Sequence, residues 1–308
     1  MKAKNIIFRS GSLHLAGTLL LPETMGPYPA VLLIAGSGQV DRDENAKKLH
    51  INALHDIAVS LAEHGFASLR YDKRGVGASE GDYWETGFYD NVADAQAALD
   101  YLKLVPEILP SQVFLLGHSE GAAIATHLAS TGIDVTGVIL LAGWARDGED
   151  LLLWQAEQVI KGMNGPNKWL INLLHLDIRK MQQKQFENIK RSKKTWSRKL
   201  TARINDKWLR ETLAYDPTQD LPKIKVPILA LTGSKDIQVD PADLDRMAEF
   251  VQGDFEKQEL PGITHILRTD PAEPALAHYK SLVAQPVDPH VLESISGWLQ
   301  KEIVRNKN

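Results

Sequence analysis

Ser119 occupies the centre of a Gly-x-Ser-x-Gly pentapeptide, GHSEG, which follows the apolar run VFLL and precedes the small-residue segment AAIATHLAS. This context predicts a sharp turn from a buried strand into a helix, with the serine hydroxyl presented at the turn. Gly117 and Gly121 permit a tight turn and close packing of the helix. Ser119 is therefore a candidate nucleophile, which needs a base and a group that orients the base.

Asp236 and His265 follow Ser119 in the chain order serine, acid, histidine that such a site requires. Asp236 comes directly after the strand-like run VPILAL and its TGSK turn, and His265 lies in the later loop PGITHILR. We therefore expect Asp236 to orient the base and His265 to be the general base. The alternatives for the acid are Asp240 and Asp147. The alternatives for the base are His278, His290 and His118, of which His118 is expected to pack beside the turn.

A serine hydrolase also needs N–H donors for the negative charge that develops on the substrate carbonyl oxygen. One donor is expected from the backbone of Glu120, the residue after the nucleophile. The other is expected from Ser37 in the glycine-flanked loop IAGSGQ, where Gly36 and Gly38 allow the backbone to approach closely. The Glu120 side chain is expected to form a structural hydrogen bond or salt bridge.

The apolar runs predict a doubly wound α/β fold with a mostly parallel sheet. Five runs rich in Val, Ile and Leu alternate with helical segments, which is typical of buried parallel strands. The first 22 residues alternate as two antiparallel strands of a hairpin. Residues 49–64 have helical spacing and end at Gly65.

The alternation is interrupted between residues 147 and 216. This segment is predicted to be all-helical, with helices over 150–160, 167–176 and 178–196. It is net basic in a chain of net charge -4, and its tryptophans are candidates for lining a substrate pocket. We interpret it as an inserted cap, or lid, over the carboxyl edge of the sheet, with residues 1–146 and 217–308 as the core domain. The tryptophans of this segment are Trp154, Trp169, Trp196 and Trp208.

Five motifs together resemble the α/β-hydrolase esterases of the serine aminopeptidase-like group: GSGQVDRDE, YDKRGVGASEG, GHSEG, LTGSKDIQVD and PGITHILR. The resemblance covers most of residues 5–300 and is weakest across the cap. It implies a catalytic triad of Ser119, Asp236 and His265, and an oxyanion hole at Ser37 and Glu120. Many relatives have His-Gly before the oxyanion residue, where this chain has Ala35-Gly36.

Charged residues in two of these motifs are expected to lock loops by ion pairs and turn hydrogen bonds rather than to take part in chemistry. They are Asp41, Arg42, Asp43, Asp72 and Arg74. KRGVGASEG lacks the spacing of a dinucleotide-binding loop, and no cluster of histidines and carboxylates suggests a metal site.

The sequence therefore predicts a serine hydrolase that cleaves small-molecule carboxylic esters, with short to medium acyl chains, through an acyl-enzyme and without a cofactor. A peptidase, in particular an aminopeptidase, or an acyltransferase on the same triad is the alternative. A ligand receptor without turnover is a further one. The absence of cysteine fits a cytoplasmic protein, and no secretory signal, membrane span or nucleic-acid partner is expected.

Overall fold

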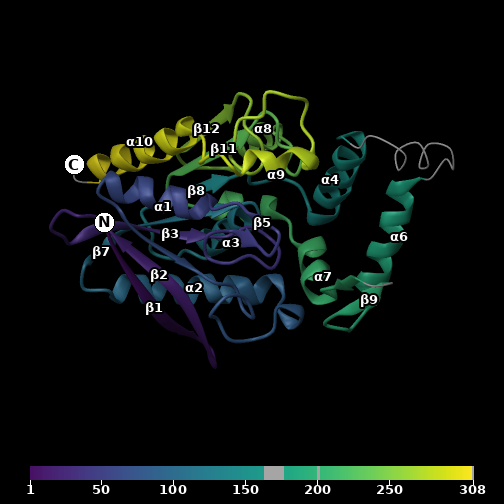
Figure 1. The fold of residues 1–308 in the computed structure, drawn as a ribbon, viewed down its shortest axis with the longest axis horizontal. Coiled ribbons are helices and arrows are strands. Elements are labelled where there is room, and N and C mark those ends of the chain that lie inside the picture. Colours follow the sequence, from purple (N-terminus) through teal and green to yellow (C-terminus); the bar gives the residue numbers. More distant parts are fainter. Residues whose placement is uncertain (163–176, 200–201, 307–308) are drawn as a thin grey trace.

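The structure is a computed structural model that describes residues 1–162, 177–199 and 202–306 (Figure 1). Eight strands form one sheet in the order β1-β2-β6-β3-β7-β8-β11-β12. β2 pairs antiparallel with β1 and with β6, and all other neighbours are parallel. The predicted α/β sheet and N-terminal hairpin are thus confirmed. The strands are β1 (Lys2–Ser10), β2 (Leu13–Leu21), β3 (Tyr28–Ile34), β6 (Ala67–Tyr71), β7 (Ile108–His118), β8 (Gly137–Leu141), β11 (Ile228–Gly233) and β12 (Phe255–Leu260).

Helices cover both faces of this sheet, and each face has its own hydrophobic core (Figure 1). Alternate residues of β3 illustrate the division. Ala30, Leu32 and Ile34 pack towards α2, α3 and α8, whereas Val31 and Leu33 pack towards α1 and α10. The helices are α1 (Ala53–Glu63), α2 (Phe88–Leu104), α3 (Glu120–Ser130), α8 (Asp243–Phe250), α9 (Tyr279–Leu282) and α10 (Pro289–Arg305), with 3₁₀ turns at Tyr83–Glu85, Pro217–Gln219, Leu221–Lys223 and Leu276–His278.

One predicted helix begins later than its sequence pattern suggested. Leu49 and His50 form strand β5, which pairs with β4 (Asn45–Ala46) in a short hairpin. Two hydrogen bonds between Asn45 and Asn52 close this hairpin, and Asn52 has a left-handed φ of 51°. Because that conformation cannot continue into a helix, α1 begins only at Ala53.

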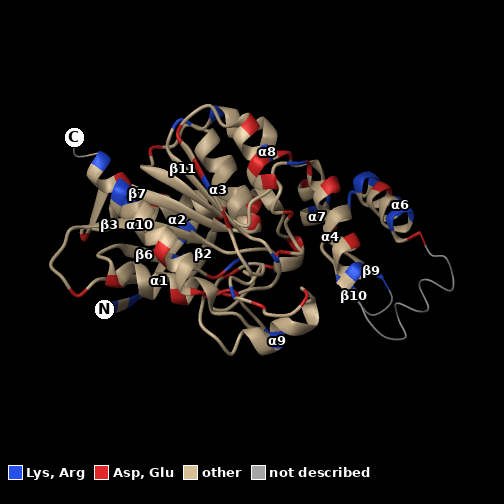
Figure 2. Cartoon of the chain, turned by 90° about the horizontal axis from the view of Figure 1, so that it is seen from above, with Lys and Arg blue, Asp and Glu red and all other residues tan. Residues whose placement is uncertain are grey.

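The segment 147–216 contains α4 (Gly148–Gly162), α6 (Ile178–Arg191), β9 (Ser197–Lys199), β10 (Ala202–Ile204) and α7 (Asp206–Ala214). These elements lie together beyond one end of the sheet, and α6 is the outermost (Figures 1 and 2). α4, α6 and α7 share a small apolar cluster that includes Leu153, Phe186 and Leu209.

The prediction that this segment is all-helical was wrong in one part. β9 and β10 form an antiparallel hairpin, and α6 ends at Arg191 rather than at residue 196. The helix stops because Ser192 is extended and its carbonyl accepts a hydrogen bond from Arg210. The helix predicted over 167–176 lies outside the described residues.

The turn between β7 and α3 depends on two glycines. Ser119 has φ 55° and ψ -119°, so the chain reverses direction at a single residue. A Cβ at Gly117 would lie 2.0 Å from the Gly121 carbonyl oxygen, and a Cβ at Gly121 would lie 2.0 Å from the Ile34 carbonyl oxygen. Any side chain at either position would therefore push α3 away from the sheet.

We predict that Gly121→Ala lowers the free energy of unfolding by about 3 kcal/mol, because backbone atoms cannot move aside as a flexible side chain would. Urea denaturation followed by circular dichroism measures the change. Gly297→Ala is the matched control. Gly297 is exposed in the middle of α10 and has no atom near its Cβ position, so the alanine should instead stabilise by about 0.5–1 kcal/mol. Equal effects of the two substitutions would contradict the proposed role of close packing at Gly121.

Candidate functional site

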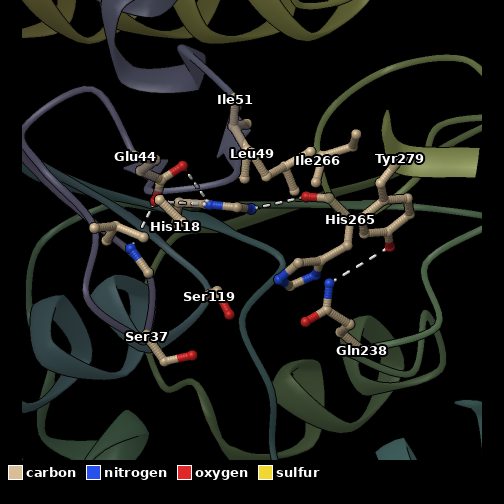
Figure 3. Close-up of a pocket in the computed structure, with 13 residues that line it drawn as sticks. Ser37, Glu44, Leu49, Ile51, His118, Ser119, Gln238, His265, Ile266 and Tyr279 are labelled. Atoms are coloured by element: carbon tan, nitrogen blue, oxygen red, sulfur yellow. Dashed lines mark hydrogen bonds and ion pairs between the residues drawn. The ribbon is translucent and has the colours of Figure 1, made fainter. Parts of the chain in front are cut away.

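A pocket of about 230 Å³ opens at the carboxyl edge of the parallel strands, and Ser119 lies on its wall (Figure 3). Four strands deliver residues to this edge: β3 precedes Ser37, β7 precedes Ser119, β11 precedes Asp236 and β12 precedes His265. The residues that line the pocket are Gly36, Ser37, Val40, Glu44, Ala46, Leu49, Ile51, His118, Ser119, Gln238, His265, Ile266 and Tyr279.

Asp236 and His265 form a buried pair beside Ser119. The His265 Nδ1 lies 2.8 Å from Asp236 Oδ2, and both side chains are at most 6% exposed. The other Asp236 oxygen accepts hydrogen bonds from the backbone N–H groups of Gln238 and Val239. Since a carboxylate can only accept, Nδ1 carries the proton, and Nε2 of a neutral His265 is left with its lone pair.

The alternative acids and bases are engaged elsewhere. Asp240 accepts a hydrogen bond from Arg146 at 2.7 Å, and Asp147 caps the start of α4. His278 pairs with Asp270 and His290 with Asp288. The chain thus brings Ser119, Asp236 and His265 to one site. Among the described residues, the Ser119 hydroxyl makes no hydrogen bond to His265.

The two backbone amides that were expected to form an oxyanion hole lie at the ends of β3 and β7. Ser37 is exposed and lines the pocket, and Glu120 is the first residue of α3. Within the described part of the chain, neither N–H group donates to an acceptor, so both can donate to a ligand. The Glu120 N–H lies at the N-terminus of α3, where the helix dipole favours a negatively charged group nearby.

The Glu120 side chain makes the structural hydrogen bonds and the salt bridge that the sequence predicts. Its carboxylate is buried and accepts from three side chains. Lys73 Nζ lies 2.7 Å from one oxygen, and the indole N–H of Trp208 lies 2.6 Å from the other. Asn91 adds a hydrogen bond of 3.2 Å. Because Trp208 belongs to α7, the segment 147–216 is joined directly to the first residue after the candidate nucleophile.

Ion pairs fix the loop that follows β3. The Arg42 guanidinium donates to both oxygens of Asp72 at 3.0 and 2.6 Å, and its backbone N–H bonds the same carboxylate. Arg42 and two backbone N–H groups outweigh burial and lower the pKa of Asp72. Arg70 pairs with Asp43, and Arg74 pairs with Asp94. The charged residues of these motifs therefore lock loops, as predicted.

Sequence reasoning missed a second buried pair, between Glu44 and His118. His118 Nδ1 lies 2.9 Å from both Glu44 oxygens, and His118 Nε2 lies 2.9 Å from the His265 carbonyl oxygen (Figure 3). One Glu44 oxygen also accepts from the Gly36 N–H at 2.6 Å. The only local signal is a glutamate directly after the DRD run, and nothing in the sequence connects it with a histidine 74 residues away.

The pocket wall also differs from the expectation. It comes from the β4–β5 hairpin, from residues near His265 and from Tyr279, whereas no described residue of 147–216 lines it. Trp154 packs against Arg146, and Trp196 packs against Arg203. Trp208 bonds Glu120 instead of facing the pocket, and Trp169 lies outside the described residues.

In the part of the chain that the structure describes, no group of three or more histidines and carboxylates is arranged to hold a metal ion. None of the helices in the described ranges is both long and apolar enough to span a membrane.

A mostly parallel eight-stranded sheet with a Gly-x-Ser-x-Gly turn after β7 is the α/β-hydrolase fold. The family model described as "Serine aminopeptidase, S33" matches residues 48–272, and the chain therefore belongs to this family.

A curated relative is the esterase EstD of Thermotoga maritima, which is 26% identical over 290 residues. The match covers 93% of this chain and 66% of that protein, so the chain spans slightly less than two thirds of the relative.

Solved structures share the fold. Est1E from Butyrivibrio proteoclasticus with ferulic acid bound has a TM-score of 0.66 at 16% identity, and the match covers 97% of this chain and 99% of that one. A proline iminopeptidase from Mycobacterium smegmatis has a TM-score of 0.67 at 12% identity, with 98% and 100% covered. Likeness at such low identity concerns the fold and leaves the substrate open.

Proposed function

We propose that this hydrolase is a carboxylesterase that works through an acyl-enzyme on Ser119. The observation that carries the proposal is the buried pair of Asp236 and His265 Nδ1, which leaves the other ring nitrogen, Nε2, at the pocket beside a serine held at φ 55°. The esterase EstD, similar over nearly the whole chain, adds support.

In the proposed reaction His265 Nε2 takes the proton of Ser119 as Oγ attacks the ester carbonyl carbon. The N–H groups of Ser37 and Glu120 hold the oxyanion, and Asp236 stabilises the imidazolium. His265 then gives its proton to the leaving alcohol. A water molecule, deprotonated by His265, attacks the acyl-enzyme, and release of the acid returns the proton to Ser119.

The pocket supports short to medium acyl chains. Its 230 Å³ is below the volume of about 300–1,000 Å³ that is usual for drug-sized ligands, and its wall is apolar at Val40, Leu49 and Ile266.

An aminopeptidase would need a carboxylate free to bind the substrate's amine. Among the described residues that line the pocket, Glu44 is the one carboxylate, and it is already bonded to His118 and Gly36. This engagement favours ester over aminoacyl substrates.

We also propose that residues 147–216 form an inserted cap on a core of residues 1–146 and 217–308. The separate apolar cluster shared by α4, α6 and α7 supports this division. In the proposal the cap governs approach to the site, while the β4–β5 hairpin sets the size of the acyl group.

We predict that Ser119→Ala lowers kcat by roughly 10⁶-fold, because the nucleophile is lost. Hydrolysis of 4-nitrophenyl butyrate measures the effect, and circular dichroism checks the fold. Wild-type protein should also react with a fluorophosphonate, and peptide mass spectrometry should find the adduct on Ser119. An adduct on another residue, or turnover by the variant above a few per cent, would refute the nucleophile assignment.

Asp236→Asn should lower kcat by roughly 10⁴-fold, since an amide favours the wrong tautomer of His265. Asp240→Asn is the matched control because Asp240 bonds Arg146 rather than a histidine. Its kcat is expected to stay within a few-fold of wild type. A larger loss of kcat for the Asp240 variant would instead assign the role of the acid to Asp240.

Shortening Leu49 should shift the acyl-chain preference. Leu49→Ala enlarges the pocket, so the ratio of kcat/KM for the octanoate ester to that for the butyrate ester should rise about tenfold. Trp154→Ala serves as the control, since Trp154 contacts Arg146 and lines no part of the pocket. If the control shifts the ratio and Leu49→Ala does not, the size limit lies in the cap.

A further inference from the structure

Glu44 and His118 lie beside the proposed site but have no part in the reaction as described. Both side chains are buried, at 3% and 4% exposed, and together they connect three segments of the chain. The Glu44 carboxylate accepts from Gly36, next to Ser37, and contacts His118, next to Ser119. His118 in turn contacts the backbone carbonyl of His265.

The hydrogen-bond partners of His118 determine its charge. Its Nδ1 faces a carboxylate and its Nε2 faces a carbonyl oxygen, and both partners are acceptors, so both ring nitrogens carry protons. Burial alone would disfavour the imidazolium, but the Glu44 charge outweighs burial and raises the pKa of His118. His118 and the Gly36 N–H likewise overcome burial and lower the pKa of Glu44. A doubly protonated His118 cannot serve as the general base.

The surrounding geometry leaves little freedom. Glu44 has a left-handed φ of 65°, which is unusual for a residue with a side chain, and its N–H bonds the Asp41 carbonyl. A Cβ on Gly36 would lie 3.3 Å from both the Glu44 carboxylate and the Ser119 Cβ. The rings of His118 and His265 are 4.9 Å apart. A shift of Glu44 or His118 would therefore also move the backbone at Ser37 and at His265.

We propose that Glu44 and His118 are positioning residues. Their hydrogen bonds run from the Gly36 N–H to the His265 carbonyl, and they hold the loop of Ser37 and the loop of His265 in place relative to Ser119. This inference rests on the proposed esterase function. A displacement of about 1 Å in such a site can cost on the order of 10²-fold in rate.

His118→Phe removes both hydrogen bonds of the ring. It is expected to lower kcat 10–100-fold per active site, with KM within about threefold of wild type. Active sites are counted by stoichiometric fluorophosphonate labelling of Ser119, so that unfolded protein does not lower the kcat calculated per active site.

Glu44→Gln should keep the chain of hydrogen bonds. Its amide oxygen can accept from Gly36, and its NH₂ can donate to Nδ1 of a neutral His118 that still donates from Nε2. This variant is expected to retain kcat within about threefold. The double variant Glu44→Gln/His118→Phe buries no unpaired charge, so it tests the loss of the ring even if His118→Phe fails to fold, and its kcat should fall as far as that of His118→Phe.

His127→Phe is the matched control, because it breaks a histidine–carboxylate pair of similar length away from the pocket, 2.8 Å to Asp220 against 2.9 Å between His118 and Glu44. It should lose stability and keep kcat. The proposal is overturned if the double variant keeps wild-type kcat per labelled site, or if Glu44→Gln loses as much as the double variant. If wild-type protein neither hydrolyses the ester nor labels at Ser119, the proposed function itself fails, which is a distinct result.

Discussion

The close approach of three backbone segments at Gly117, Gly121 and Ile34 is the constraint on which the rest of the site depends. It allows β7 to end and α3 to begin with a single residue between them. That residue, Ser119, therefore projects from the sheet edge on a rigid support rather than from a loop. The neighbouring strands then bring their own loops to the same edge, since the carboxyl ends of parallel strands coincide.

Those loops are irregular, and buried charge pairs hold them. Asp72 anchors the loop after β3 through Arg42, and Glu120 is held by Lys73 and Trp208. Each of these carboxylates would be costly if it lost its partner, because an unpaired buried charge destabilises by about 3–5 kcal/mol. Loops fixed in this way have few alternative conformations, which is what a preorganised site requires.

The sequence predicted those parts of the molecule that local patterns encode. Apolar runs marked the buried strands, and the glycines around Ser119 marked the turn. Chain order then led to Asp236 and His265. Glu44 was missed because its partner is far away in the chain, and the β4–β5 hairpin was missed because strands of two residues carry no periodicity. The β9–β10 hairpin was also missed, because its strands of three residues are again too short to show a period.

Helix α7 belongs to two packing units at once, and this has a thermodynamic consequence. Leu209 and Leu213 pack in the cluster of 147–216, while Trp208 and Asn205 at its start bond Glu120 and the backbone of Tyr83 and Thr86. These bonds tie α7, and with it the apolar cluster of α4 and α6, to the residue that follows Ser119. By reciprocity, any free energy by which an ordered α4 and α6 favour a group bound at the Glu120 N–H equals the free energy by which that group favours their order.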